Sequence, residues 1–527
     1  MAGTGALRWR WAVLALVGML LLAACGSTVQ NAARRAQQGR GGDASLGADA
    51  SGGLGGTGDA GAGGLAGSGG SGTGAAGGST SAGRSGAAAA GGPNGSTSGG
   101  VSNGSGPGVT DTTINVGVVY AVNSGAANAT IGAPGITGGD EKQNSDVLIN
   151  DINAHGGVAG RKLVPVYAQL DATSPDTLDS QYQAACDTLT QDHKVFVIFS
   201  GTNPVMVQCA HNRGVVALQT NLTESDSDIF RRFPYYVEVN SLNLDRIAAA
   251  EVAGLQAQGY FSGWDANADR PGPGKAKVGV LITDEPSFVS ATNRTLLPAL
   301  AKAGSAVDPA NVVRVPRVER ASDEGAIGAA VSNAVLRFRT NGVEHVIIQE
   351  PSGVTSLLFA NNADSQKYYP RYGVNSQNGL QALADAGAYP KSQLPGAIGV
   401  GWMPSLDITP AQNADDGPFS TDARKRCVNL YKAHGVTFSD TNAKGVGMND
   451  CNSMFFFQQV GNTIKGLLNR DIFFAAVNRL GPSFQSVDTF ATNFSPAQHD
   501  GAAAIRYWGY VPSCQCMQYT SGNIPVP

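Results

Sequence analysis

The chain has 527 residues, of which 14% are charged, and its formal net charge at pH 7 is −4. The sequence contains no basic stripe, which argues against nucleic acid as a partner. Beyond a long Gly-rich region near the N-terminus, about 400 residues remain, which is enough for two α/β lobes that each have a hydrophobic core.

The N-terminus has the features of an exported lipoprotein. Arg8 and Arg10 precede an apolar run over residues 11–22, which is shorter than a membrane-spanning helix requires. Small residues then precede Cys25, in an arrangement that resembles a bacterial lipobox. We therefore expect residues 1–24 to be a signal peptide and Cys25 to carry a lipid that anchors the protein on the extracytoplasmic face of the cell membrane. The alternative is an ordinary cleaved signal followed by a coincidental cysteine.

Residues 25–108 are predicted to form a disordered tether. Residues 26–108 contain no aromatic side chain and consist mostly of Gly, Ala and Ser. Such a segment cannot bury enough apolar surface to offset its chain entropy. Its average reach would be on the order of 50 Å. A simple spacer is the preferred interpretation, and a role in spanning peptidoglycan or in clustering is the alternative.

The first folded segment alternates strand and helix patterns. Three segments of helical period separate four apolar runs rich in β-branched residues, at 114–120, 163–170, 195–199 and 215–219. This alternation predicts βαβ units and a parallel sheet, and nearly unbroken apolar runs are typical of strands that are covered on both faces. The first long helix is expected over 146–155, ending at Gly156 and Gly157, because glycine tolerates the left-handed conformation that terminates helices.

Small polar residues follow these predicted strands. Right-handed crossovers place the carboxyl ends of parallel strands at one edge of the sheet, where open α/β sheets bind small molecules. We therefore expect a ligand to be held at this edge, assisted by helix N-termini, by Ser124, Ser200, Thr202, Thr220 and Asn221.

The order of motifs in this segment resembles a known family. NDINAHGGVAGRKLVPV is followed by DHKVFVIFSGTNP. Together these runs resemble the type 1 periplasmic binding proteins, the branched-chain amino-acid and amide receptors of ABC transporters. The match is strongest over residues 110–225 and stays collinear to residue 512. It implies an α/β fold of two doubly wound parallel-sheet lobes that are joined by a three-segment hinge.

Six cysteines remain besides Cys25, an even number in an exported chain, which favours disulfides. Cys186 is expected on the helix before the third strand and Cys209 on the helix after it, so the two can meet on the sheet surface. Cys427 and Cys451 lie on or near consecutive predicted helices.

Cys514 and Cys516 are left as a C-x-C pair, which would form a tight bridge. The alternative, a metal site, would need further thiol or histidine ligands, and none is evident nearby in the sequence. The six histidines are scattered without metal-site spacing. We therefore expect neither a metal nor a cofactor.

The second lobe is predicted to begin after residues 235–240, where the chain leaves the first lobe and Asn240 is expected to contact the ligand. A helix over 243–258 precedes a Pro/Gly-rich loop at 261–276. A second alternating series follows, with strands predicted at 277–283, 312–315, 345–349, 371–374 and 397–402.

The resemblance also implies ligand contacts from this lobe. Phe288 stands where the family places an aromatic residue that covers the ligand, although it could equally be a core residue at a helix start. Gln349 and Asn375, at strand ends, are expected to face the cleft. The family's amino-acid receptors carry an acid in the loop that corresponds to 372–377, and this sequence has none there. Because an unpaired ammonium in a dry cleft is costly, this departure favours a neutral or anionic ligand. Glu350 could supply the acid from the neighbouring loop, but we expect it to be a solvated loop end.

After Met403 the chain is expected to return to the first lobe. Helices are predicted at 421–434, 448–469 and 471–480, and a final strand at 504–511 belongs to the second lobe. The first lobe would therefore comprise 109–242 and 404–489, and the second 243–403 and 490–520. Three crossings of this kind allow the lobes to close by rigid-body rotation.

The folded part carries no motif for catalysis: no G-x-S-x-G, phosphate loop, H-E-x-x-H or post-strand G-x-G-x-x-G. Ser200 could be imagined as a nucleophile, but the sequence identifies no general base for it. We therefore predict a non-enzymatic, monomeric solute receptor that captures a small polar ligand and delivers it to the membrane permease of an ABC transporter. The alternatives are a sensor module without a permease, and a lobe pair that binds nothing.

Overall fold

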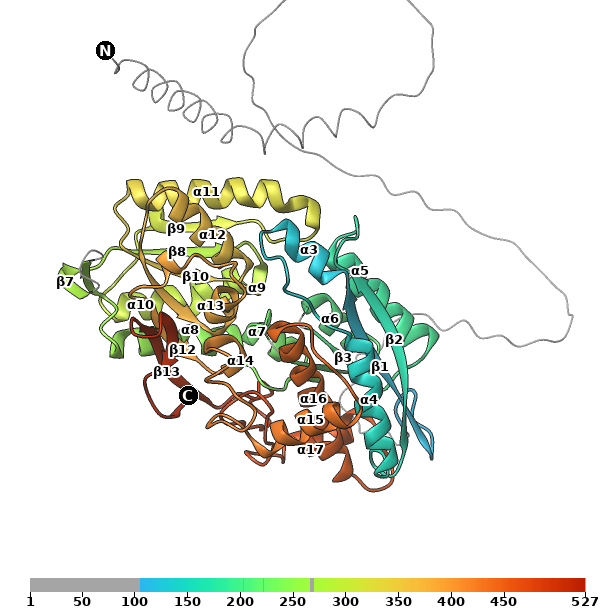
Figure 1. Cartoon of the computed structure of the whole chain (residues 1–527). Coiled ribbons are helices and arrows are strands. Elements are labelled where there is room, and N and C mark those ends of the chain that lie inside the picture. Colours follow the sequence, from blue (N-terminus) through green and yellow to red (C-terminus); the bar gives the residue numbers. More distant parts are fainter. Residues whose placement is uncertain (1–104, 202, 221, 266–269, 527) are drawn as a thin grey trace, which may run out of the picture. The chain divides into compact units, whose positions relative to one another are not determined.

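The computed structural model describes residues 105–526 apart from positions 202, 221 and 266–269 (Figure 1). The predicted signal peptide, Cys25 and the tether as far as residue 104 lie outside the described residues. Residues 105–108, which were predicted to belong to the tether, are part of the described fold, and the Gly106 amide donates a hydrogen bond to the Leu468 carbonyl (2.8 Å). Within the described residues, no helix combines the length and the apolar character that a membrane span needs.

Lobe 1 is built on a five-stranded parallel sheet in the order β2-β1-β3-β4-β5. The four strands predicted for this segment are confirmed, although the third begins at Val197 rather than at residue 195. The strands are β1 (Thr113–Val122), β2 (Lys162–Asp171), β3 (Val197–Ser200), β4 (Val216–Gln219) and β5 (Tyr236–Glu238).

Helices cover both faces of this sheet (Figure 1). One apolar core packs the sheet against α4 (Glu141–Ala154), α15 (Asp422–Ala433), α16 (Thr441–Asn462) and α17 (Arg470–Val477). The core on the other face includes α5 (Leu178–Asp187), α6 (Pro204–Asn212) and α7 (Ser227–Arg232). The short helix α3 (Ser124–Thr130) follows β1. This double coverage is what the unbroken apolar strands require.

Two helices begin earlier than the apolar pattern predicts, because aspartate side chains cap them. Asp140 accepts the Gln143 amide at the start of α4, and Asp440 accepts the Ala443 amide at the start of α16. The prediction that the second of these helices continues to residue 469 is wrong. Gly466 adopts a positive φ of 79°, and Asn469 caps α17 instead.

Lobe 2 contains a mixed sheet in the order β14-β13-β12-β11-β10-β8-β9, with β15 paired to β13. The predicted parallel arrangement is correct for β8 (Val278–Thr283), β9 (Val312–Val315), β10 (His345–Gln349), β11 (Arg371–Asn375) and β12 (Ile398–Gly401). The chain then returns from lobe 1 and adds antiparallel strands, which a short turn can connect: β13 (Ala504–Val511), β14 (Cys516–Tyr519) and β15 (Ile524–Pro525).

The lobe 2 sheet is also covered on both faces. Helices α8 (Leu244–Ala257), α9 (Pro286–Ala291) and α10 (Leu297–Lys302) pack on one face. On the other face lie α11 (Glu324–Thr340), α12 (Val354–Ser365) and α13 (Leu380–Asp385). The short helix α14 (Pro404–Asp407) follows β12 at the sheet edge.

Residues 261–276, predicted to be a loop, contain two antiparallel strands, β6 (Ser262–Asp265) and β7 (Arg270–Lys275). Trp264 anchors this ribbon, since the Arg371 guanidinium lies 4.2 Å from the centre of its ring. The high Pro and Gly content therefore did not indicate that this segment forms two paired strands.

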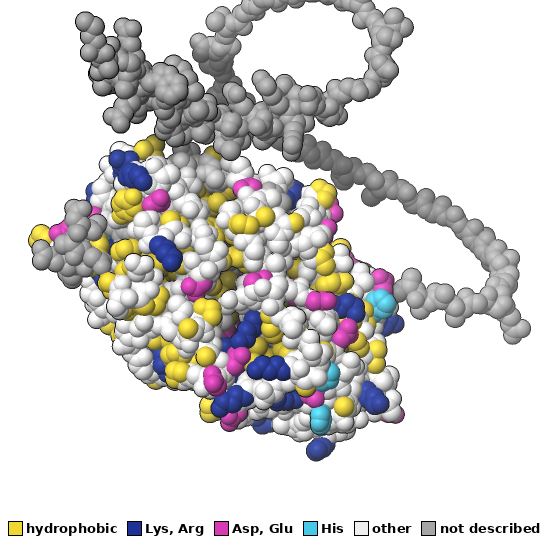
Figure 2. Space-filling model, viewed as in Figure 1, with side chains coloured by type: hydrophobic (Ala, Val, Ile, Leu, Met, Phe, Trp, Pro, Cys, Tyr) yellow, Lys and Arg dark blue, Asp and Glu magenta, His cyan; other side chains and the backbone are white. Residues whose placement is uncertain are grey.

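The chain passes between the lobes three times, between β5 and α8, between β12 and α15, and between α17 and β13. On the face shown in Figure 2, basic and acidic side chains are interspersed over the region of α15–α17, whereas hydrophobic and uncharged side chains predominate over lobe 2. The exact lobe boundaries at residues 242, 403 and 489 remain predictions.

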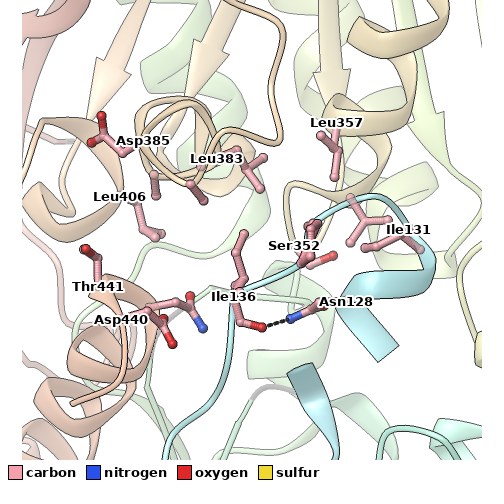
Figure 3. Close-up of a pocket in the computed structure, with 18 of the residues that line it drawn as sticks. Asn128, Ile131, Ile136, Ser352, Leu357, Leu383, Asp385, Leu406, Asp440 and Thr441 are labelled. Atoms are coloured by element: carbon pink, nitrogen blue, oxygen red, sulfur yellow. Dashed lines mark hydrogen bonds between the residues drawn. The ribbon is translucent and has the colours of Figure 1, made fainter. Parts of the chain in front are cut away.

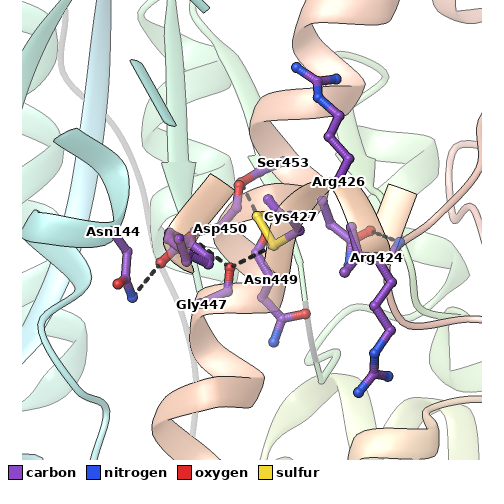
Figure 4. Close-up of a disulfide and its surroundings, with 12 residues drawn as sticks. Asn144, Arg424, Arg426, Cys427, Gly447, Asn449, Asp450 and Ser453 are labelled. Atoms are coloured by element: carbon purple, nitrogen blue, oxygen red, sulfur yellow. Dashed lines mark hydrogen bonds between the residues drawn. A yellow bond between two sulfur atoms is a disulfide. The ribbon is translucent and has the colours of Figure 1, made fainter. Parts of the chain in front are cut away.

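The three predicted disulfides are present in the structure. Cys186 on α5 bonds Cys209 on α6, and Cys427 on α15 bonds Cys451 on α16 (Figure 4). The third bond joins Cys514 and Cys516. The described residues contain no group of three or more His, Cys, Asp or Glu side chains that could hold a metal ion.

We predict that the Cys427–Cys451 bond stabilises the protein far more than the Cys514–Cys516 bond. The first links positions 24 residues apart, whereas the second links positions 2 apart, so the first removes more entropy from the unfolded chain. Replacing both cysteines of the longer link by alanine should lower the free energy of unfolding by about 3 kcal/mol, measured by urea denaturation. The matched control is the double alanine variant of the shorter link, and equal losses in both variants would contradict the prediction.

Candidate functional site

A cavity of about 530 Å³ lies between the two lobes. Lobe 1 contributes the end of α3 with the segment that follows it, Leu222 and the start of α16. Lobe 2 contributes the N-terminal part of α12 and helix α13, and Leu406 of α14 completes the wall. In Figure 3, the side chains of Leu357, Leu383 and Leu406 lie on one side of the cavity, and those of Asn128, Ile136 and Asp440 lie on the other. A concave space between domains is a common location of a small-molecule site.

The walls of this cavity are mostly apolar. Besides the leucines and Ile136, they include Ile131, Pro134, Leu222, Val354 and several alanines. The polar lining consists of Asn128, Ser352, Asp385, Asp440, Thr441 and Asn442. Among the described lining residues there is no Lys, Arg or His, so an anionic ligand would find no counter-charge on a side chain here. The sequence-based expectation of an anionic ligand therefore gains no support from this cavity.

Several polar groups at the cavity already have protein partners. The Asn128 side chain donates to the Ile136 carbonyl (2.9 Å), and Asp440 accepts the Ala443 amide (3.0 Å) and the Thr137 hydroxyl (2.6 Å). Burial would raise the pKa of Asp440, but these hydrogen bonds outweigh it and lower the pKa. Burial raises the pKa of Asp385, against a hydrogen bond from Gln381.

The described ligand residues predicted for lobe 1, Ser124, Thr220 and Asn240, lie near the carboxyl edge of its sheet but do not line the interlobe cavity. Ser124 begins α3, and its hydroxyl accepts the Gly138 amide (2.8 Å). Thr220 lines a smaller cavity inside lobe 1, and buried Asn240 donates to the Asn449 side chain (3.1 Å). The Ser200 side chain and residues Thr202 and Asn221 lie outside the described residues.

The predicted ligand residues of lobe 2 are engaged within that lobe. Phe288 is 2% exposed and belongs to the apolar core around α8, which is the alternative that the sequence left open. Gln349 donates to the Glu251 carboxylate (2.8 Å), and Asn375 accepts the Gln377 amide (2.9 Å). None of the three lines the interlobe cavity.

The expectation that Glu350 is a solvated loop end is wrong. Glu350 is 1% exposed, and its carboxylate accepts hydrogen bonds from the amides of Thr355 (2.7 Å) and Ser356 (3.1 Å). These amides lie in the first turn of α12, where backbone donors have no partner within the helix. Glu350 therefore caps α12, a role that charge and position in the sequence did not reveal.

The sequence reasoning missed the apolar lining residues. Ile131 and Ile136 lie in the short connection between α3 and α4, and Leu383 lies on a helix of only six residues. Isolated apolar residues in such segments resemble ordinary core positions. The one available signal was the segment 131–136, where isoleucines flank Gly and Pro in a loop that should otherwise be polar.

No protein-family model and no curated protein sequence matches this chain, but many solved structures match its fold. A solute-binding protein of an ABC transporter from R. palustris, in complex with 4-hydroxybenzoate, has a TM-score of 0.55 and 15% identity, covering 79% of this chain and 98% of that one. A fatty acid ABC transporter substrate-binding protein from Thermomonospora curvata has a TM-score of 0.52 and 16% identity, covering 80% and 97%. One from Desulfitobacterium hafniense, in complex with Leu, has a TM-score of 0.50 and 12% identity, covering 77% and 99%.

This chain has the fold of a type 1 periplasmic binding protein. The two lobes and three connections of that fold are the arrangement that the sequence motifs implied. The interlobe cavity lies beside direct contacts between the two lobes. The Gln377 side chain of lobe 2 accepts the Thr223 amide (2.9 Å) and donates to the Thr223 carbonyl (2.8 Å).

A second contact between the lobes is a buried ion cluster around Arg317, after β9. Its guanidinium lies 3.5 Å from Asp179 and 3.2 Å from Glu224, both in lobe 1. It also lies 3.2 Å from Glu285 and 3.3 Å from Glu319, both in lobe 2. Burial raises the pKa of Glu224 to about 8, although Arg317 opposes this shift. Arg317 is thus shared between carboxylates of both lobes.

We predict that Glu251 makes the protein less stable as the pH rises. Burial raises its folded-state pKa to about 7, above the ordinary value of 4.5, despite hydrogen bonds from Gln349 and Asn375. The folded protein therefore keeps a proton that the unfolded chain releases between these two pH values, so the free energy of unfolding falls with rising pH over this window.

The test is Glu251→Gln, which keeps an acceptor for Gln349. The loss of unfolding free energy between pH 5 and pH 8, from denaturant titrations, should shrink by about 2 kcal/mol in this variant. Glu344→Gln, at an exposed position, serves as the matched control and should leave the loss unchanged. An identical pH dependence in Glu251→Gln and the native protein would refute the prediction.

Proposed function

We propose that this protein is an extracytoplasmic solute receptor that captures a small ligand between its lobes and delivers it to the permease of an ABC transporter. The observation that carries the proposal is the interlobe cavity of about 530 Å³, which has apolar walls and polar groups at several positions. The fold supports the same function, since the solved structures that it resembles include solute-binding proteins with small ligands. The protein acts by binding and closure, without catalysing a reaction.

The proposed ligand of the interlobe cavity has an apolar body and no net negative charge. Leucine and isoleucine side chains offer favourable contact to hydrocarbon, whereas Asp385 and Asp440 would repel a carboxylate. Ser352 and Thr441 line the cavity and can orient a hydroxyl or amide group, whereas the Asn442 side chain already donates to the Thr137 carbonyl (2.8 Å). Aromatic alcohols, short amides and polyols with a hydrocarbon part meet these requirements better than benzoates or fatty acids.

We predict that a neutral ligand of this kind raises the melting temperature of the full chain. The panel comprises aromatic alcohols, short amides, polyols, amino acids and aromatic carboxylates. A ligand at 100 times its dissociation constant stabilises the folded state by about 2.7 kcal/mol, which is a readily measured shift. Ala382→Trp would fill the cavity and abolish the shift, whereas Ala257→Trp, at an exposed position on α8, should preserve it.

Two outcomes would count against this proposal. A shift that survives Ala382→Trp would locate binding elsewhere, and a well-folded protein that responds to no member of the panel would argue against a receptor function. A response confined to carboxylates would support capture but contradict the proposed ligand charge.

The proposed receptor is a monomer anchored in the cell membrane through a lipid on Cys25, after removal of residues 1–24. We predict that cells grown with radiolabelled palmitate incorporate label into the native protein and not into Cys25→Ala. Cys514→Ala, which removes an exposed cysteine, is the matched control and should remain labelled. Label in Cys25→Ala would exclude this cysteine as the acylation site.

A further inference from the structure

A second cavity of about 140 Å³ lies inside lobe 1, between the sheet and helices α4 and α16. It does not share lining residues with the interlobe cavity. Its apolar walls are formed by Val118, Val119, Phe199, Val446 and Met454. Its polar side chains are those of Glu141, Ser145, Thr220, Asn449, Asp450 and Ser453. The cavity thus combines a hydrocarbon surface with two carboxylates.

The two carboxylates have few partners. Glu141, in the first turn of α4, accepts the Ala121 amide (3.2 Å), and Asp450 on α16 accepts the Asn144 side chain (3.3 Å) (Figure 4). Neither forms an ion pair with any residue that the structure describes. Lys142, adjacent in sequence to Glu141, instead pairs with Asp146 (3.0 Å). The protein therefore supplies no described cation to balance this pair.

The electrostatic state of the pair reflects this imbalance. Burial raises the pKa of Glu141 to about 7, and burial together with the charge of Glu141 raises the pKa of Asp450 well above its usual range. The tyrosines that interact electrostatically with the pair are Tyr167, Tyr182 and Tyr431, whose own pKa values burial also raises, so they stay neutral. A cation entering the cavity would stabilise the ionised form of both carboxyl groups, which burial alone disfavours.

An independent observation also indicates a missing ligand. Ser145 is 0% exposed and lines the same cavity, yet its hydroxyl has no hydrogen-bond partner among the described residues. Buried hydroxyls are ordinarily paired, and leaving one unpaired destabilises a protein. A hydrogen-bond donor that entered the cavity could bond this oxygen.

The chemistry of the cavity favours an organic cation over a metal ion. Calcium takes about 6–8 oxygen ligands, whereas only two carboxylates are present, and no described cluster of three metal-binding side chains exists. A primary ammonium has three N–H donors, which Glu141, Asp450 and Ser145 can accept. The valines, Phe199 and Met454 would contact its carbon atoms.

We propose that this cavity binds a primary alkylammonium group, with Glu141 and Asp450 as its counter-ions and Ser145 as its third acceptor. The group enters past Glu141, which also lines a shallow pocket at the end of β1 together with Asn123 and Ser124. This proposal goes beyond solute capture between the lobes, because the cavity is built from lobe 1 alone.

The test is calorimetric titration of the full chain with ethylammonium chloride at pH 8, supported by melting curves. Ethylammonium should bind saturably and raise the melting temperature, whereas ethanol and acetate should do neither. Glu141→Gln and Asp450→Asn should each weaken binding at least about tenfold, because each removes a charge-assisted hydrogen bond. Asp146→Asn, on the same helix but outside the cavity, should change the affinity less than about twofold.

The pH supplies a second readout that does not depend on variants. Because the raised pKa of Glu141 lies near 7, protonation should weaken ethylammonium binding about 10- to 30-fold at pH 5.5 relative to pH 8. The melting curves also show whether each variant folds, so loss of binding is not confused with loss of structure.

Three results would overturn the proposal. The first is the absence of saturable ethylammonium binding by the native protein. The second is equal affinity in the native protein and in both carboxylate variants. The third is a rise in melting temperature with sodium or calcium but not with ethylammonium. Failure here leaves capture between the lobes untouched, since Ala382→Trp reports on that cavity separately. Conversely, ethylammonium binding that persists in Ala382→Trp would confirm that the two sites are independent.

Discussion

The structure depends on the burial of each sheet on both faces. Unbroken apolar strands in the two lobes require helices above and below, and this requirement brings distant parts of the chain together. Lobe 1 cannot complete its core with residues 109–242 alone, because α15, α16 and α17 cover one face of its sheet. The return of the chain after β12 therefore follows from the need for a core, and it also places the start of α16 at the interlobe cavity.

The same double coverage explains why most polar side chains at the strand ends are hydrogen-bonded to other protein groups. At the carboxyl edge of the lobe 2 sheet, Gln349 bonds buried Glu251, and Glu350 caps α12. These side chains are not free for a ligand, because they form the hydrogen bonds that buried polar groups nearby require. The walls of the interlobe cavity come instead from loops, short helices and the first turns of longer helices, which lie outside the sheets.

Most of the fold could be predicted from the sequence, because β-branched runs and helical periods reflect local burial. The errors occur where a side-chain cap sets the boundary, as at Asp440, or where apolar residues continue past the helix end, as after Asn462. The site was harder to predict, because the cavity depends on how two lobes approach each other and no local pattern encodes that approach. Ile136 and Leu383 thus read as ordinary apolar residues, whereas Phe288, chosen by resemblance, packs in a core.

The cluster around Arg317 bears on the balance between open and closed forms. If the lobes part, Arg317 stays with Glu285 and Glu319 of its own lobe, so the guanidinium is never stranded without a counter-ion. When the lobes close, Asp179 and Glu224 replace water at one side of the Arg317 guanidinium, which its own lobe already neutralises. A charge that remains paired in both forms contributes little bias toward either.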